Sequence, residues 1–81
     1  MNACPDYRRG YRACDASPEV QALRVRLDND GAAALAAKIA ARKHPTAENV
    51  AAHATAEATL DATRVELMKV SGQVFDAAMG F

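Results

Sequence analysis

The chain has 81 residues, of which 51% are hydrophobic, and its ten basic residues balance ten acidic residues. A chain of this length forms one domain, residues 1–81, and buries only about 60–65% of the surface that its unfolded form exposes. Twenty of the hydrophobic residues are alanines, so side chains large enough to fill a core are few. No run of about 18 apolar residues is present to span a membrane.

The N-terminal residues lack the basic region and the apolar core of a secretory signal, which predicts a cytoplasmic protein. In that reducing compartment we expect Cys4 and Cys14 to be free thiols, although the sequence leaves a disulfide bridge or a bound metal open. Formal charge is +2 over residues 1–26, +1 over residues 27–46 and −3 over residues 47–81. The chain is therefore basic at its start and acidic at its end.

The first predicted element is a short amphipathic helix over residues 6–15, with Asp6 as its N-cap. Its apolar face consists of three side chains at helical spacing: Tyr7, Tyr11 and Cys14. Its opposite face carries three guanidinium groups: Arg8, Arg9 and Arg12. Gly10 in the middle costs about 1 kcal/mol relative to alanine, so we expect the rest of the domain to hold this helix in place.

The next two predicted helices span residues 18–28 and 32–43. Ser17 and Pro18 form a clear start signal, because serine caps helices and proline fits their first turn. Asp28-Asn29-Asp30-Gly31 favours a turn over a helix interior, so we expect a break near Gly31, with one continuous helix over 18–43 as the alternative. His44-Pro45 ends the segment, since a residue before proline is disfavoured in the helical region.

The last predicted helix spans residues 47–79, with Thr46 as its N-cap. Gly80 stands where a left-handed residue ends a helix, and we expect Phe81 to fold back toward Phe75. Together the elements predict an all-α fold, a small bundle of three to four helices. A helical hairpin with a short N-terminal helix is the alternative arrangement.

The second half of this last helix carries two apolar arcs when its residues are placed at about 100° intervals. One arc consists of Leu60, Leu67, Val70 and Val74, and the other of Val65, Met68, Phe75 and Met79. An outer helix needs only one stripe of about 100°, so two neighbours are required, of which one is the chain itself. The heptad spacing of Leu60, Leu67 and Val74 is too short to predict a coiled coil, and its continuation at His53 is polar.

Catalytic and metal-binding patterns are missing from the sequence. Cys4, Cys14, His44 and His53 have the residue types of a zinc site, but nine residues separate the cysteines and eight separate the histidines, where compact sites use two to five. No nucleophile is placed beside a base by a known motif, and there is no phosphate-binding glycine loop. We therefore expect no enzyme activity, no metal and no cofactor.

These features favour a small helical protein that binds another protein or a second copy of itself, as an adaptor, a subunit or a stoichiometric inhibitor. Inhibitors encoded by phages and mobile elements share this profile, which is an analogy only. Neither a membrane nor a small-molecule substrate is expected as partner. The predicted contact residues are Arg8, Arg9, Arg12, Leu60, Leu67, Val74 and Phe81.

Two other functions compete with this hypothesis. Arg8, Arg9 and Arg12 interleave with tyrosines, a pattern typical of nucleic-acid binding, and Lys38, Arg42 and Lys43 would add to such a surface. Zero net charge argues against that function. The other alternative is a structural homodimer in which two chains form a four-helix arrangement.

Overall fold

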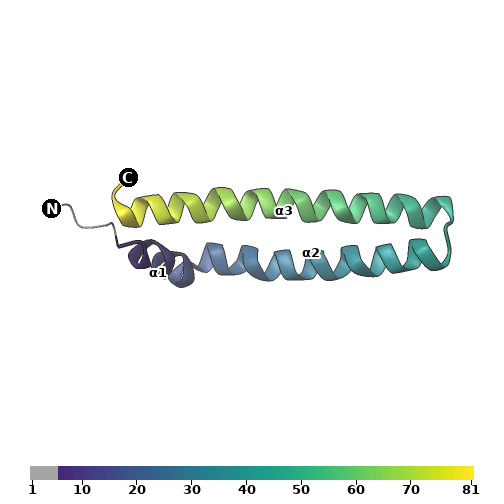
Figure 1. The fold of residues 1–81 in the computed structure, drawn as a ribbon, viewed down its shortest axis with the longest axis horizontal. Coiled ribbons are helices and arrows are strands. Elements are labelled where there is room, and N and C mark those ends of the chain that lie inside the picture. Colours follow the sequence, from purple (N-terminus) through teal and green to yellow (C-terminus); the bar gives the residue numbers. More distant parts are fainter. Residues whose placement is uncertain (1–5) are drawn as a thin grey trace.

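A computed structural model describes residues 6–81, which form three helices: α1 (Arg8–Ala16), α2 (Pro18–Lys43) and α3 (Ala47–Met79). Helices α2 and α3 run antiparallel as a long hairpin, and α1 lies at the end opposite the connecting loop, beside the C-terminal end of α3 (Figure 1). The molecule measures 62 × 26 × 15 Å. An all-helical fold is confirmed for these residues, in the form of the hairpin with a short N-terminal helix.

Local capping chemistry sets the helix ends that the sequence predicts. The Ser17 side chain accepts a hydrogen bond of 3.2 Å from the Val20 N–H, and Thr46 accepts one of 3.1 Å from the Asn49 N–H. Gly80 has φ of 79°, and the Phe81 N–H donates to the Asp76 carbonyl at 2.9 Å. This left-handed stop is the predicted C-terminal end of α3.

Two local predictions need correction. Helix α1 begins at Arg8, so Tyr7 occupies the N-cap position and Asp6 lies one residue further upstream, where its carboxylate accepts a 3.1 Å hydrogen bond from the Arg8 N–H. Phe81 does not cover Phe75 but is 74% exposed. The aromatic rings that pack against Phe75 come from α1 and the residue before it instead.

The predicted break near Gly31 is also wrong, because α2 continues without interruption for 26 residues. Thr63 of α3 donates a 2.6 Å hydrogen bond to the Asp30 carboxylate. A side chain at Gly31 would lie in ordinary contact with Leu60, so α3 packs directly along this part of α2. Contacts with a neighbouring helix therefore outweigh the local preference of Asn, Asp and Gly for a turn.

Buried and half-buried residues recur at alternating intervals of three and four along both long helices, the spacing of a heptad seam. In α2 the seam consists of Val20, Leu23, Leu27, Asp30, Ala34, Ala37 and Ala41. In α3 it consists of Asn49, His53, Ala56, Leu60, Thr63, Leu67, Val70 and Val74. The short heptad fragment seen in the sequence thus extends over the whole hairpin, and the half-buried His53 belongs to it.

Large side chains gather at only one end of this seam. The buried cluster of Cys14, Val20, Leu23 and Val70 lies where α1 meets the hairpin, with Leu67, Val74 and Phe75 packed against it. Toward the loop the apolar residues of the seam are mostly small, among them Ala34, Ala37 and Ala56, and its larger residues there, Asn49 and His53, are polar. Because apolar burial stabilises in proportion to area, most of the hydrophobic stabilisation is concentrated at the α1 end.

The hairpin exposes more surface than a globular chain of its mass. Its accessible surface is 5918 Å², whereas a compact protein of 8.6 kDa exposes about 4,700 Å². The radius of gyration is 17.6 Å, against about 12 Å for a compact domain of this length. Two long helices side by side leave each other's outer faces uncovered.

We expect Thr63→Val to lower the free energy of unfolding by about 1–3 kcal/mol, because it leaves the half-buried Asp30 carboxylate without its donor. Valine has the shape of the fully buried Thr63 side chain, so the loss of stability reports the contribution of the hydrogen bond. Urea unfolding followed by circular dichroism measures it. Adding Asp30→Leu should restore stability to near the wild-type value, since apolar replacement of both partners is often neutral. Unchanged stability of the single variant would contradict this role.

Candidate partner-binding groove

Helix α1 packs against the ring of Phe75 in α3. This ring stacks on Tyr7 with centroids 6.0 Å apart and an interplanar angle of 16°, and it meets Tyr11 at 5.2 Å and 58°. Gly10 lies directly over the same ring, and a Cβ atom at that position would overlap it. Tyr7, Gly10 and Tyr11 together therefore enclose Phe75, and α1 approaches α3 this closely because residue 10 lacks a side chain.

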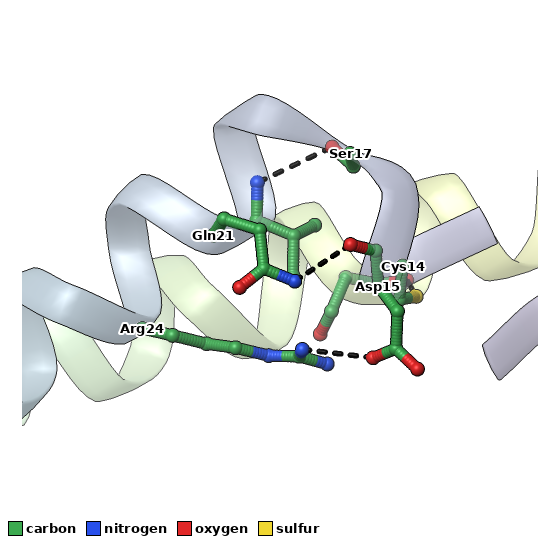
Figure 2. Close-up of polar contacts among 7 residues, drawn as sticks. Cys14, Asp15, Ser17, Gln21 and Arg24 are labelled. Carbon is green, nitrogen blue, oxygen red and sulfur yellow. Dashed lines mark hydrogen bonds and ion pairs between the residues drawn. The ribbon is translucent and has the colours of Figure 1, made fainter. Parts of the chain in front are cut away.

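Polar contacts hold α1 at a defined angle to α2 (Figure 2). Helix α1 ends at Ala16, and the Ser17 side chain then caps α2. The Gln21 side-chain amide donates to the Asp15 carbonyl at 2.7 Å, and the Arg24 guanidinium pairs with the Asp15 carboxylate at 2.8 Å. These contacts satisfy a carbonyl at the C-terminal end of α1, which has no partner within its own helix.

The Cys14 thiol is buried between α1 and α3. It is 5% exposed, and its sulfur donates to the Ser71 carbonyl at 3.3 Å. The Ser71 hydroxyl in turn donates to the Leu67 carbonyl at 2.6 Å. Both polar groups therefore have hydrogen-bond partners, and α3 continues unbroken past Ser71 and Gly72.

An open groove of about 480 Å³ lies where the three helices meet. Its lining residues are Tyr11, Cys14, Arg24, Met68, Ser71, Gly72 and Phe75. Beyond the groove the apolar surface continues along α3, where Val65 is 66% and Met68 is 68% exposed. These two residues lie on the same arc of α3 as Phe75, so the groove and the exposed residues beyond it form one apolar strip. Helix α1 covers this strip only at Phe75, near the C-terminal end of α3.

The arginine face predicted for the first helix is present. Arg8, Arg9 and Arg12 are all exposed. Arg8 pairs with Asp6 at 3.1 Å, whereas Arg9 and Arg12 form no ion pair with residues 6–81. Arg12 directly follows the groove residue Tyr11 and points about 100° away from it around α1.

Lys38, Arg42 and Lys43 lie at the other end of the molecule, next to the loop (Figure 1). Helix α2 is about 39 Å long at 1.5 Å per residue, so the two basic clusters do not form one surface.

The apolar residues predicted to contact a partner have different places in the structure. Leu60, Leu67 and Val74 are half-buried in the seam with α2, and Leu67 and Val74 pack against the buried cluster. Phe81 is exposed at the end of the chain. Of the two arcs predicted on α3, the chain therefore covers the one containing Leu60 and leaves half of the other, Val65 and Met68, exposed.

Two features of the surface escape prediction from the sequence. The groove is one, because it depends on how far α1 reaches along α3. The other is an exposed apolar stripe on α2 that includes Leu35 and Ile39. Its signal is present in the sequence, since these residues are four apart and lie about 80–120° around a straight helix from Leu27, but the predicted break at Gly31 conceals it.

The four candidate zinc ligands are not brought together. Cys4 lies outside the described residues, Cys14 belongs to α1, and His44 and His53 lie near the loop at the opposite end of the molecule. Within residues 6–81, no three histidine, cysteine, aspartate or glutamate side chains are close enough together to hold a metal ion. Nor does any helix in that range have the length and apolarity needed to cross a membrane.

Comparisons of the chain with models of protein families, with curated proteins and with solved structures find no match. The candidate binding site within the described residues is the apolar groove where the three helices meet.

We expect Gly10→Ala to loosen α1, because the added methyl group overlaps Phe75. Overpacking costs about 1–3 kcal/mol, which exceeds the gain of up to about 1 kcal/mol in helix propensity. In a Cys4→Ser background, the buried Cys14 thiol should then react faster with an aromatic disulfide reagent. The reaction rate, with thermal unfolding alongside, measures the effect.

Gly72→Ala is the matched control, since a Cβ atom at that position meets nothing within 4 Å. It should raise stability by up to about 1 kcal/mol and leave Cys14 protected. If both variants gain stability and protect Cys14 equally, the close contact between Gly10 and Phe75 does not hold α1.

Proposed function

We propose that this protein is a non-catalytic helical interaction protein, an adaptor, a subunit or a stoichiometric inhibitor, that binds an amphipathic helix of another protein in the groove between α1 and α3. The observation that carries the proposal is the apolar groove of about 480 Å³ whose apolar strip continues, uncovered, along α3. Amphipathic helices are recognised in hydrophobic grooves through anchor residues spaced three or four apart. Met68 and Val65, three apart on α3, supply such a strip.

The residue types around the groove support a protein partner. Tyrosine, methionine and arginine are enriched at the centres of protein interfaces, and the groove brings Tyr11, Met68 and Arg24 together. Methionine adapts its shape to apolar side chains of different form. The groove is thus suited to receiving leucine, phenylalanine or methionine anchors.

Charge narrows the class of partner further. Arg9 and Arg12 are exposed on α1, the helix that supplies Tyr11 and Cys14 to the groove, and they form no ion pair with residues 6–81. Exposed charges of this kind steer association and select partners more than they add affinity. The proposed partner helix therefore carries apolar anchors on one face and acidic residues at the edge that meets α1.

The shape of the molecule also favours a binding role. A rod 15 Å thick has room for one layer of two helices, so side chains on its outer faces stay in water until another molecule covers them. A partner that covers these faces would increase the buried apolar area and so stabilise the chain. For nucleic acid the same shape is less suitable, because its two basic clusters lie at opposite ends of α2 and present no continuous track for phosphates.

Val65→Glu and Met68→Glu should abolish capture of the partner, because each places a carboxylate in the apolar strip. We expect at least a tenfold weaker interaction, since loss of a central interface contact costs more than about 1.4 kcal/mol. Affinity capture from the native host, quantified by mass spectrometry for each variant, measures this.

Val50→Glu is the control. It also introduces a glutamate on α3, at a residue that is 54% exposed but lies near the loop, away from the groove. This variant should still capture the partner. Capture of the same proteins by wild type and by Met68→Glu would overturn the groove as the binding site. Loss of capture only when Arg8, Arg9 and Arg12 become glutamate would shift the site to the arginine face.

A further inference from the structure

The outer face of α2 carries a second apolar surface, separate from the groove. Val25, Leu35 and Ile39 are 60%, 58% and 45% exposed, and Ala32 and Ala36 lie between them. At about 100° per residue these five residues fall within an arc of about 100°, on the side of α2 facing away from the seam. A stripe of this width is what one neighbouring helix covers.

Charged residues of opposite sign mark the two ends of this stripe. Asp28 lies toward its N-terminal end, and Arg42 and Lys43 lie at its C-terminal end, all three exposed. Within residues 6–81 these side chains form no ion pair, whereas Arg24 and Arg26 of the same helix pair with Asp15 and Glu66. The charges at the ends of the stripe are therefore available to another molecule.

The stripe is complementary to the same stripe on a second, antiparallel copy of α2. An antiparallel copy centred between Leu35 and Ala36 places Leu35 level with Ala36 of the second copy, and Ala32 level with its Ile39. The same alignment places Asp28 level with Lys43 of the second copy, with Arg42 beside it. Large side chains thus meet small ones, and acids meet bases, at both symmetry-related ends.

We propose that two copies of this chain associate through the outer faces of their α2 helices, antiparallel about a two-fold axis near Leu35. A two-fold interface uses one patch on both subunits, so it requires the self-complementarity that this stripe has. Alanines between the larger side chains let the two helices approach closely. This inference does not depend on the groove, which lies at the α1 end and stays open in the dimer.

The geometry sets the strength and the shape of the dimer. A single contact between two helices is smaller than the roughly 1,200 Å² at which stable interfaces begin, so association is reversible and dependent on concentration. In the antiparallel pair the two α1 helices lie at opposite ends, about 55 Å apart at 1.5 Å per residue. If the groove binds as proposed, the dimer presents two grooves facing different ends.

Sedimentation velocity and light scattering on the purified full chain, from micromolar to millimolar concentration, test the dimer. We expect the mass to rise from 8.6 kDa toward twice that value, and Leu35→Glu and Ile39→Glu to remain monomeric throughout. Val65→Glu, on the groove side, should dimerise like wild type, which separates this test from that of the groove. Circular dichroism of each variant confirms that the helices remain folded.

A charge exchange tests the antiparallel alignment itself. Asp28→Lys places like charges together at both ends of the interface and should raise the dimer dissociation constant about tenfold. Adding Lys43→Asp should recover most of the loss, because the pair is then restored with its signs exchanged. A wild-type protein that stays monomeric, a Leu35→Glu variant that dimerises normally, or a double variant as weak as Asp28→Lys would each overturn the proposal.

Discussion

A hydrogen bond of 2.6 Å from the Thr63 hydroxyl to the Asp30 carboxylate joins the two long helices at the middle of their seam. Thr63 is fully buried, and Asp30 is half-buried. A polar pair inside a helix seam tolerates only the register in which donor and acceptor meet. On the loop side four of the seven seam residues are alanines, namely Ala34, Ala37, Ala41 and Ala56. Such small side chains constrain the register less than large ones do, so the contact between Asp30 and Thr63 has a large part in fixing it.

That register also determines how the side chains pack at the α1 end of the molecule. It sets Val20 and Leu23 of α2 against the side chains around Val70, and together they bury Cys14. It also places Phe75 beside α1, and Gly10 lets α1 approach that ring closely. The groove is the space left beside this contact, because α1 ends at Ala16 before it reaches Met68 and Val65.

The proposed binding surfaces arise because the hairpin has more apolar faces than it buries. Two helices side by side bury one seam, yet both long helices carry apolar residues on a second face as well, with Met68 on α3 and Leu35 on α2 strongly exposed. The two surfaces differ in character. The groove has aromatic walls and an arginine edge suited to a foreign helix, whereas the α2 stripe has an acid at one end and bases at the other, a pattern that matches its own reverse.

The sequence by itself determined the features that depend on neighbouring residues. The helix ends at Ser17, Thr46 and Gly80, the amphipathic character of α1 and the two arcs of α3 all follow from capping, backbone preference and periodicity. Each of these acts over a few residues, which is the range that a sequence pattern describes.

Only the tertiary structure decided that α2 runs unbroken past Gly31, that the arc with Leu60 faces the chain's own α2, and that Tyr7 and Tyr11 rather than Phe81 cover Phe75. Each of these outcomes depends on contacts between distant residues, as between Asp30 and Thr63, which lie 33 residues apart. A local turn preference of about 1 kcal/mol at Gly31 is weaker than the packing of a whole helix against it, and no pattern within the segment reveals that competition.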